Sequence, residues 1–93
     1  MRNWNRINMA KTIRSDGHVA LCKALADARN AAKLTQVELA DRLNCHQSLI
    51  ARIESGERRI DAVELIVLAR AMDADAYDIL RKVDGATDSA HHI

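Results

Sequence analysis

The chain has 93 residues, of which 48% are hydrophobic and 29% charged, a composition that suits one compact domain. Its only aromatic side chains are Trp4 and Tyr77, so the core must be aliphatic, which favours helices and argues against binding of single-stranded nucleic acid by base stacking. The longest apolar run, residues 65–69, is far shorter than the roughly 20 residues that span a bilayer. Because no secretory signal is recognisable either, we expect a cytoplasmic location. The aliphatic composition leads us to expect an all-α domain.

The net charge of +1 is divided unevenly along the chain. Residues 1–59 hold 11 Lys and Arg against 6 Asp and Glu, a net +5, whereas residues 60–93 hold 3 against 7, a net −4. A basic first half suits a phosphate backbone, and an acidic second half would face away from it or meet other proteins. Ordinary scatter of surface charge is the alternative explanation.

The cysteines and histidines do not predict a metal site, a cofactor or a disulfide. Cys22 and Cys45 are far apart in the sequence, without a CxxC pair or zinc-type spacing. We expect Cys22 to pack as a small apolar side chain and Cys45 to lie at a turn, where a redox-sensing thiol is conceivable. His91 and His92 belong to a polar tail, residues 84–93, which we expect to be flexible.

The first 16 residues differ in pattern from the rest of the chain. Ile7, Met9 and Ile13 occupy odd positions with mostly polar residues between them, which predicts a short strand or an extended arm. Asp16 is a candidate cap for a long helix over about residues 18–33. The apolar stripe of that helix consists of Leu21, Leu25, Ala28 and Ala32.

Two shorter helices follow, each bounded by local signals. Thr35 and Glu38 have the spacing of a capping box, which predicts a helix over residues 36–43. Asn44 tolerates left-handed backbone geometry and can end that helix sharply. The next helix is expected over residues 47–55, with Gly56 as its stop.

The second half predicts two more helices. Asp61 and Glu64 form another capping box before a helix over residues 62–72, and a weaker signal at Asp75 precedes one over residues 76–82 with Ile79, Leu80 and Val83. The fourth helix is expected to bring Val63, Ile66, Ala69 and Met72 to the core. From the first four of these helices we expect the following side chains to be buried together: Leu25, Leu39, Ala40, Leu43, Ile50, Ile53, Ile66 and Ala69.

The segment from Gln36 to Ser55 has the pattern of two short helices joined by a three-residue turn. Such helices cross closely and need a small residue at the crossing, here Ala40, with large aliphatic side chains around it. The outward face of the second helix then consists of Gln47, Ser48, Ala51, Arg52 and Ser55. Gln and Arg are side chains that can form paired hydrogen bonds with the edges of adenine and guanine.

These features resemble the helix-turn-helix domain of the phage repressor and Cro superfamily, also called the xenobiotic-response-element (XRE) family of bacterial regulators. The resemblance covers about residues 20–81 and rests on motifs within residues 21–29, 34–40, 53–59 and 76–80. It implies a five-helix, lambda-repressor-like domain over residues 17–83, whose third helix enters the major groove of double-stranded DNA. The implied function is transcriptional regulation, with repression as the expected effect.

The resemblance also implies contacts to DNA, position by position. The residues facing base edges would be Gln47, Ser48 and Arg52. Those contacting the DNA backbone would be Gln36, His46, Ser55, Arg58 and Arg59. Arg29 would bond Glu54 and hold a phosphate nearby. Phosphate contacts position such a module, whereas contacts with bases specify the sequence.

Two positions depart from the family pattern. Asn44 stands where the family usually has Gly, and His46 stands where it usually has a Ser or Thr cap. Asn is accepted in a left-handed turn, but His is a poor N-cap, so the start of the helix is weaker or the imidazole contacts a phosphate. Each arginine could also be an ordinary solvated charge, and Arg29 with Glu54 a purely structural ion pair.

The expected partners are double-stranded DNA with a pseudo-palindromic operator and a second copy of the chain, because one recognition helix reads only a few base pairs. The expected dimer surface is the last helix with Ile79 and Val83, helped by the N-terminal arm, residues 1–16. The alternative function is an antitoxin-like module that binds another protein through its acidic half and DNA only secondarily. No nucleophile–base pair or phosphate loop is recognisable, so we do not expect an enzyme.

Overall fold

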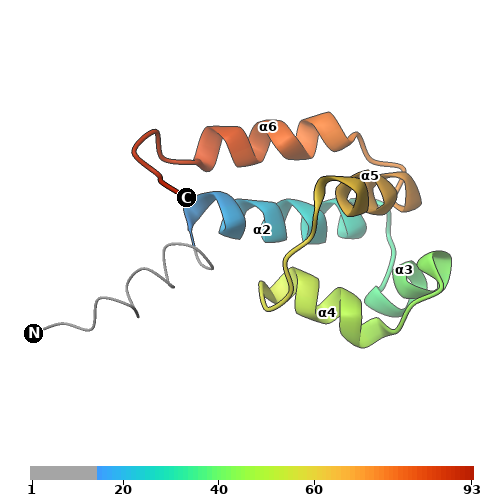
Figure 1. Cartoon of the computed structure of the whole chain (residues 1–93). Helices are drawn as coiled ribbons and strands as arrows, with labels where there is room; N and C mark the ends of the chain where they lie inside the picture. Colours follow the sequence, from blue (N-terminus) through green and yellow to red (C-terminus); the bar gives the residue numbers. More distant parts are fainter. Residues whose placement is uncertain (1–14) are drawn as a thin grey trace, which may run out of the picture.

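The computed structural model describes residues 15–93, and the predicted N-terminal arm lies almost wholly outside the described residues. The described part contains five helices and no strand, which confirms the predicted all-α class. The helices are α2 (Asp16–Ala31), α3 (Gln36–Leu43), α4 (Gln47–Ser55), α5 (Ala62–Ala71) and α6 (Ala76–Ala86) (Figure 1). Within this part of the chain, no helix has the length and apolar character needed to cross a membrane.

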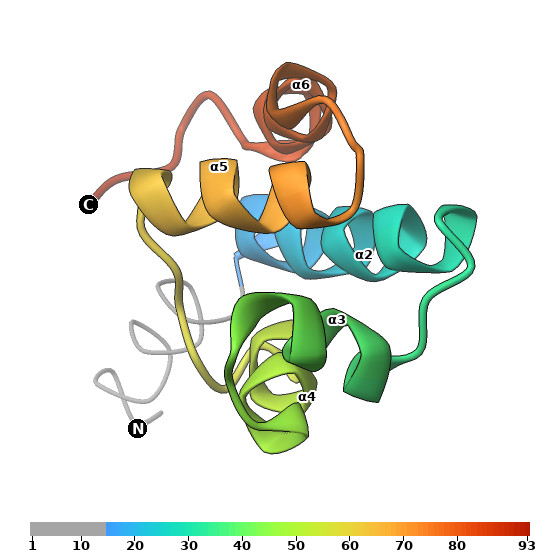
Figure 2. The same ribbon diagram turned by 90° about the vertical axis from the view of Figure 1, so that its right-hand side faces the viewer.

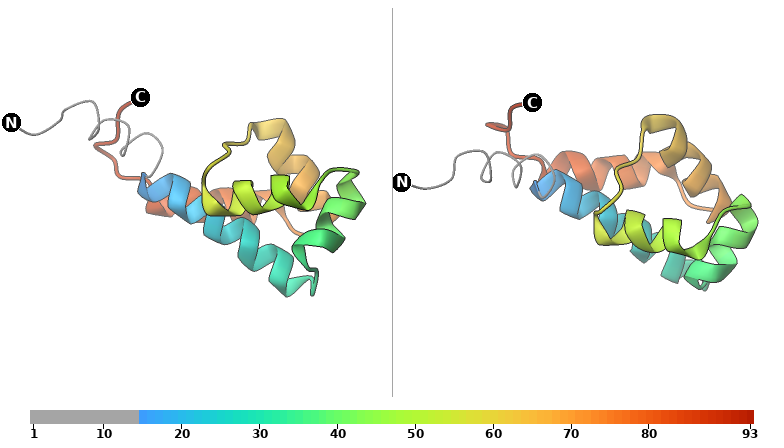
Figure 3. Two further views of the ribbon diagram at one scale, coloured as in Figure 1. Left: turned by 90° about the horizontal axis from the view of Figure 1, so that it is seen from below. Right: turned by 60° about the horizontal axis from the view of Figure 1, so that its bottom comes forward.

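Helix α2 lies in the middle of the domain, with other helices packed on two of its sides. Helix α6 runs beside α2 in the opposite direction, with α3 and α4 on the other side of α2 (Figure 1). The view along α6 in Figure 2 shows α3 and α4 at one edge of the domain and α6 at the opposite edge. Seen from below, α4 lies on the near face, in front of α6 (Figure 3). The arrangement therefore exposes α4 on the side of the domain away from α6.

The turn between α3 and α4 has the predicted geometry. Asn44 is left-handed, with φ of 53°, and Gly56 ends α4 with φ of 87°. Both predicted capping boxes, Thr35–Glu38 and Asp61–Glu64, are present. His46 makes no side-chain cap, as expected of a poor N-cap. The two helices of the motif therefore have the bounds that the sequence predicts.

Helix α2 is shifted two residues toward the N-terminus from its predicted span. Ser15 is its N-cap instead of Asp16, because the Ser15 hydroxyl accepts a hydrogen bond of 3.2 Å from the His18 amide. Asp16 lies in the first turn, where its negative charge suits the helix dipole. The helix ends before Lys33, which adopts a left-handed φ of 59°.

The core is aliphatic, as the composition requires. Its buried cluster consists of Ala24, Leu25, Leu34, Leu39, Ala40, Ile50, Ile53, Leu68, Ala69, Met72 and Ile79. Ala40 is only 2% exposed, as expected for the small residue of the α3–α4 crossing. Leu43 is half-buried and packs against the edge of the cluster instead of inside it.

Two of the four side chains predicted to be buried by the α5 segment, Ala69 and Met72, are in the core, and the other two are not. Val63 is 70% exposed, and Ile66 is half-buried outside the core cluster. Leu65 and Leu68 pack toward the core instead, next to Ala69. Because α5 is apolar around most of its circumference, the periodicity of its sequence did not single out one face.

Helix α6 continues to Ala86, beyond the predicted end at residue 82 and into the predicted tail. The Thr87 amide donates to the Val83 carbonyl at 3.0 Å, and its hydroxyl donates to the same oxygen at 2.6 Å. These bonds satisfy the Val83 carbonyl in the last turn of the helix, which includes Gly85. Ile79 is buried in the core, at 3% exposure, and is therefore not on the surface predicted for dimer formation.

Candidate nucleic-acid interface

The outward face of α4 is polar and open to solvent. Ile50 and Ile53 are buried beneath it. Gln47, Ser48 and Arg52, the three predicted base-reading residues, are all exposed. The helix periodicity that buries the isoleucines therefore places these three side chains together on the opposite face.

A network of side-chain hydrogen bonds joins this face to the two neighbouring helices. Gln47 Nε2 donates to Gln36 Oε1 at 2.7 Å, and Gln36 Nε2 donates to Glu54 Oε1 at 3.1 Å. Arg29 Nε donates to Glu54 Oε2 at 2.7 Å, and its Nη2 donates to Oε1 at 2.9 Å. The network therefore links α2, α3 and both ends of α4.

The charged pair at one end fixes the direction of every bond in the network. An arginine can only donate and an ionised carboxylate can only accept. Gln36 must therefore turn its amide nitrogen toward Glu54 and its oxygen toward Gln47. Gln47 must then donate to Gln36, which leaves its second N–H and its Oε1 without a partner among residues 15–93.

The Arg29–Glu54 pair is largely buried, with side chains 13% and 10% exposed. The hydrogen bond to Glu54 raises the pKa of Arg29 above its usual value, against the opposing effect of burial. Arg29 Nη1 also donates to the Leu34 carbonyl at 2.8 Å. Most donors of this guanidinium are thus used inside the protein, and its first role is to position Glu54.

The loop after α4 is tied to the start of α5 by Arg58. Its Nη2 lies 2.8 Å from Glu64 Oε2, and its Nη1 donates to Glu64 Oε1 at 3.2 Å and to the Arg59 carbonyl at 3.0 Å. Hydrogen bonds from Arg58, and then from the Asp61 amide, hold the pKa of Glu64 below its usual value. The side chains of this pair remain partly exposed, at 33% and 39%.

The residues predicted to contact the DNA backbone lie at both ends of α4. Gln36 is half-buried and His46 exposed at its beginning, and Arg58 is half-buried and Arg59 exposed beyond its end. The exposed Ser55 uses its hydroxyl to donate to the Arg52 carbonyl at 3.1 Å. The predicted set therefore brackets the exposed face of α4.

Comparison with known proteins identifies this arrangement. Residues 25–79, more than half of the chain, match the family model described as Helix-turn-helix. The chain belongs to this helix-turn-helix family. It is 40% identical to an XRE-family like protein from Pseudomonas syringae pv. tomato, with a TM-score of 0.73 over 87% of this chain and 99% of that one. No curated protein sequence matches the chain.

A second solved structure shares the fold. It is the clp gene regulator ClgR from C. glutamicum, with 24% identity, a TM-score of 0.69, and coverage of 77% of this chain and 92% of that one. Together these findings confirm the resemblance inferred from the sequence and make the exposed face of α4 the candidate DNA-reading surface of a helix-turn-helix protein.

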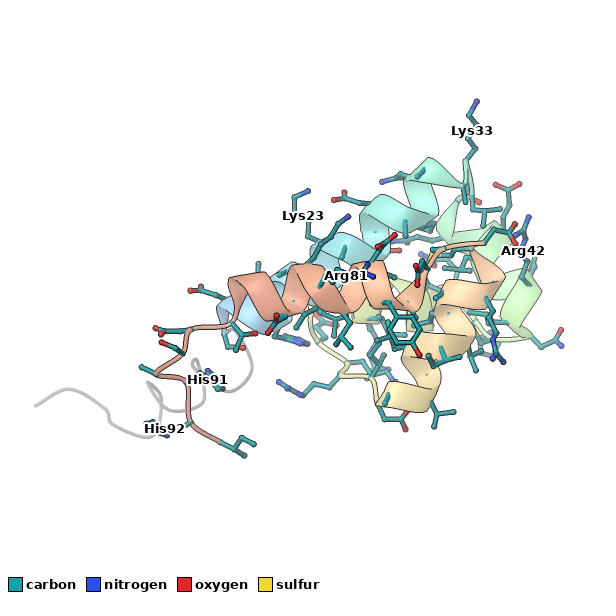
Figure 4. All side chains as sticks on the ribbon, turned by 90° about the horizontal axis from the view of Figure 1, so that it is seen from above. Lys23, Lys33, Arg42, Arg81, His91 and His92 are labelled. Atoms are coloured by element: carbon teal, nitrogen blue, oxygen red, sulfur yellow. The ribbon has the colours of Figure 1, made fainter. Side chains whose placement is uncertain are left out.

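Four further basic side chains project from elements other than α4 (Figure 4). Figure 4 shows Lys23 projecting from α2, Lys33 from the turn after α2, Arg42 from α3 and Arg81 from α6. Arg42 is bonded to the Ala71 carbonyl at 2.7 Å. None of these four side chains belongs to the predicted set of DNA contacts around α4.

Sequence reasoning missed the bond between Gln36 and Gln47. It assigned one glutamine to a phosphate and the other to a base, without linking them. The signal was nonetheless present, because each glutamine is the first residue of its helix and the two helices cross closely. A pair of long amides at the starts of two crossing helices is a pattern to look for in such motifs.

Proposed function

We propose that this protein is a sequence-specific regulator of transcription, acting as a repressor, that inserts α4 into the major groove of double-stranded DNA. The exposed Gln47, Ser48 and Arg52 on a helix-turn-helix fold are the observation that carries the proposal. A major groove about 12 Å wide admits a helix with such side chains. Repression is the proposed effect because occupying a promoter requires nothing beyond binding.

The hydrogen-bond network supports adenine as the base that Gln47 reads. The direction of the network leaves Gln47 one N–H donor and one oxygen acceptor at its tip. Adenine presents the complementary N7 acceptor and N6 amino donor in the major groove. Arg52 lies more than one turn further along α4, where its guanidinium can bond the two acceptors of a guanine.

Backbone contacts are proposed for His46 and Gln36 at the start of α4 and for Ser55, Arg58 and Arg59 at its end. Arg58 can keep its bond to Glu64 and still offer an N–H to a phosphate, because a guanidinium has five donors in a planar fork. For Arg29 the proposed role is to hold Glu54 and Gln36 in place, with at most one donor left for a phosphate.

The proposed active form is a homodimer on a pseudo-palindromic operator. Its support is an apolar strip on α6 formed by Tyr77 and Leu80, which are 68% and 51% exposed, and by the half-buried Val83. Exposed apolar patches of this kind mark interfaces between proteins. These residues replace the buried Ile79 in the surface predicted from the sequence.

Selection of bound duplexes from a random pool tests the proposal directly. We expect one enriched sequence with two inverted half-sites whose centres are about 10 base pairs, or a multiple of this, apart. Binding should weaken steeply with salt, because phosphate contacts release counterions. A pool from which no sequence is enriched would overturn base reading by α4, and a single enriched half-site would overturn the dimer.

A second candidate is an antitoxin-like module that binds another protein. It is favoured by Val63 and Val67 on α5, which are 70% and 46% exposed and border an apolar cleft. The two functions can coexist in one protein. Tight one-to-one protein binding without any affinity for duplex DNA would favour this candidate over the regulator.

A further inference from the structure

Ala51 is the one apolar residue among the five that form the outward face of α4. Helical spacing turns this position away from Ile50 and Ile53, which are 2% and 6% exposed. The side chains that share the face with Ala51 all carry hydrogen-bonding groups: Gln47, Ser48, Arg52 and Ser55. A single methyl group therefore lies within a polar surface that is otherwise suited to hydrogen bonding.

The core does not account for Ala51. The residue is half-buried, but within residues 15–93 it belongs neither to the core cluster nor to the half-buried apolar side chains that pack against that cluster. Leu49, two positions earlier on the same helix, does pack against the core. The methyl group of Ala51 is thus left for a contact outside the domain, on the helix that lies on the near face in Figure 3.

Ala51 lies one helical turn after Gln47, so the two side chains are neighbours on the surface of α4. The bond to Gln36 orients Gln47, and in the function proposed above this leaves a donor and an acceptor for adenine. One turn advances about 5.4 Å along the helix axis, whereas successive base pairs are about 3.4 Å apart. In a helix that lies along the major groove, Ala51 therefore meets a base pair one or two steps from that adenine.

The major groove offers one kind of apolar group to such a side chain. The edges of the base pairs carry hydrogen-bond donors and acceptors, and thymine alone adds a C5-methyl group. An alanine against any other base edge would remove water from a donor or acceptor without replacing its hydrogen bond.

We infer that Ala51 selects thymine, through contact between its own methyl group and the C5-methyl of the base. This rests on the proposed function and deepens it. It adds a thymine to the adenine and the guanine that are assigned to Gln47 and Arg52.

Replacement of thymine by uracil in the selected duplex tests the inference, because it removes the methyl group and keeps every hydrogen-bonding group of the base pair. Each thymine is replaced singly, and the affinity of the unmutated chain is measured at constant salt. We expect about fourfold weaker binding at one thymine per half-site, the effect of losing one buried carbon. That thymine should lie one or two base pairs from the adenine whose preference is lost in Gln47→Ala.

The Ala51→Gly variant identifies the residue that makes the contact. Without the side-chain methyl group, duplexes with thymine and with uracil at that position should bind equally well. Ala62→Gly is the matched control, since it makes the same change at an exposed position in the first turn of α5 and should keep the fourfold difference. Glycine inside a helix is destabilising, so circular dichroism checks that both variants fold. The uracil series with the unmutated chain tests the inference without them.

The outcomes separate this inference from the proposed function. A selected duplex in which no thymine methyl group contributes to affinity would overturn the inference and leave base reading by Gln47 and Arg52 in place. A uracil effect that persists in Ala51→Gly would also overturn it, because another residue or the shape of the DNA would then be responsible. A pool from which no sequence is enriched would overturn the proposed function itself.

Discussion

Gln47 donates to Gln36 across 2.7 Å, and this bond joins the first residue of α4 to the first residue of α3. Gln36 in turn donates to Glu54, which also accepts two hydrogen bonds from Arg29. The amide of the exposed Gln47 is therefore oriented, through Gln36, by the largely buried Arg29–Glu54 ion pair. Such preorganisation reduces the conformational entropy that Gln47 would lose on binding a base.

Replacing Gln36 with Ala should weaken the preference for adenine at the base read by Gln47. The expected loss is a part of the roughly 1–3 kcal/mol that one well-oriented pair contributes to discrimination. Affinities for the selected duplex and for one with that base pair changed measure the effect. The double variant with Gln47→Ala should lose little more than Gln47→Ala alone. An unchanged adenine preference in Gln36→Ala would limit Gln36 to holding a phosphate.

The Arg29→Ala variant should lose about 3–5 kcal/mol of unfolding free energy, because the largely buried Glu54 carboxylate would remain without its charged partner. Lys23→Ala is the matched control, since it removes a surface pair with Asp27 whose side chains are 75% and 49% exposed. That change should cost at most about 1 kcal/mol. Urea unfolding of the three proteins measures both differences, and similar losses in the two variants would contradict the assigned burial.

The bounds of the helices depend on local signals, whereas their buried faces and mutual contacts depend on how the helices pack together. The bounds of α3 and α4 follow from Thr35, Asn44 and Gly56, each acting on its own backbone, and the structure confirms them. The buried face of α5 depends on where the whole helix sits, and its nearly uniform apolar sequence does not encode a single face. The bond between Gln36 and Gln47 likewise exists only once two helices cross.

Ala40→Leu should destabilise the domain by roughly 1–3 kcal/mol, because the added carbons must fit into a position that is 2% exposed. Ala62→Leu makes the same chemical change at an exposed position of the first turn of α5 and should have little effect. Thermal unfolding of the three proteins checks the difference. Equal melting temperatures for Ala40→Leu and the unmutated chain would show that the crossing of α3 and α4 accommodates the larger side chain without overpacking.

The stability of the domain should depend on pH through Glu64. Its pKa is lowered in the folded state by Arg58 and by the Asp61 amide, so its contribution is complete above the usual value of 4.5. As the pH falls below 4.5, the unfolded chain takes up the proton first, and stability decreases until the folded carboxylate is protonated too.

Glu64→Gln keeps an oxygen that can accept from the Asp61 amide but removes the charge. Its melting temperature should therefore fall less between pH 7 and pH 3 than that of the unmutated chain. Glu57→Gln, which removes an exposed carboxylate without an ion pair among residues 15–93, should leave the profile unchanged. Parallel profiles for Glu64→Gln and the unmutated chain would mean that the Arg58–Glu64 pair does not stabilise the fold.

The two arginines near α4 should separate base reading from backbone contact. Arg52 is exposed on the outward face of α4, so Arg52→Ala should cost about 1–3 kcal/mol at the selected site and flatten the preference at one base pair per half-site. Arg58 lies in the loop beyond Gly56, held by Glu64. Its replacement by Ala should weaken binding to all duplexes about equally and lower the magnitude of the salt slope by about one unit per lost contact.

Titration of the unmutated chain and both variants against selected and scrambled duplexes at several salt concentrations decides between these roles. Arg58 also donates two hydrogen bonds to Glu64, so its replacement by Ala should loosen the loop between α4 and α5 as well. If Arg58→Ala lowers the melting temperature but leaves the salt slope unchanged, Arg58 supports the loop and touches no phosphate. Equal effects of both substitutions on both duplexes would show that the outward face of α4 is not the surface that reads bases.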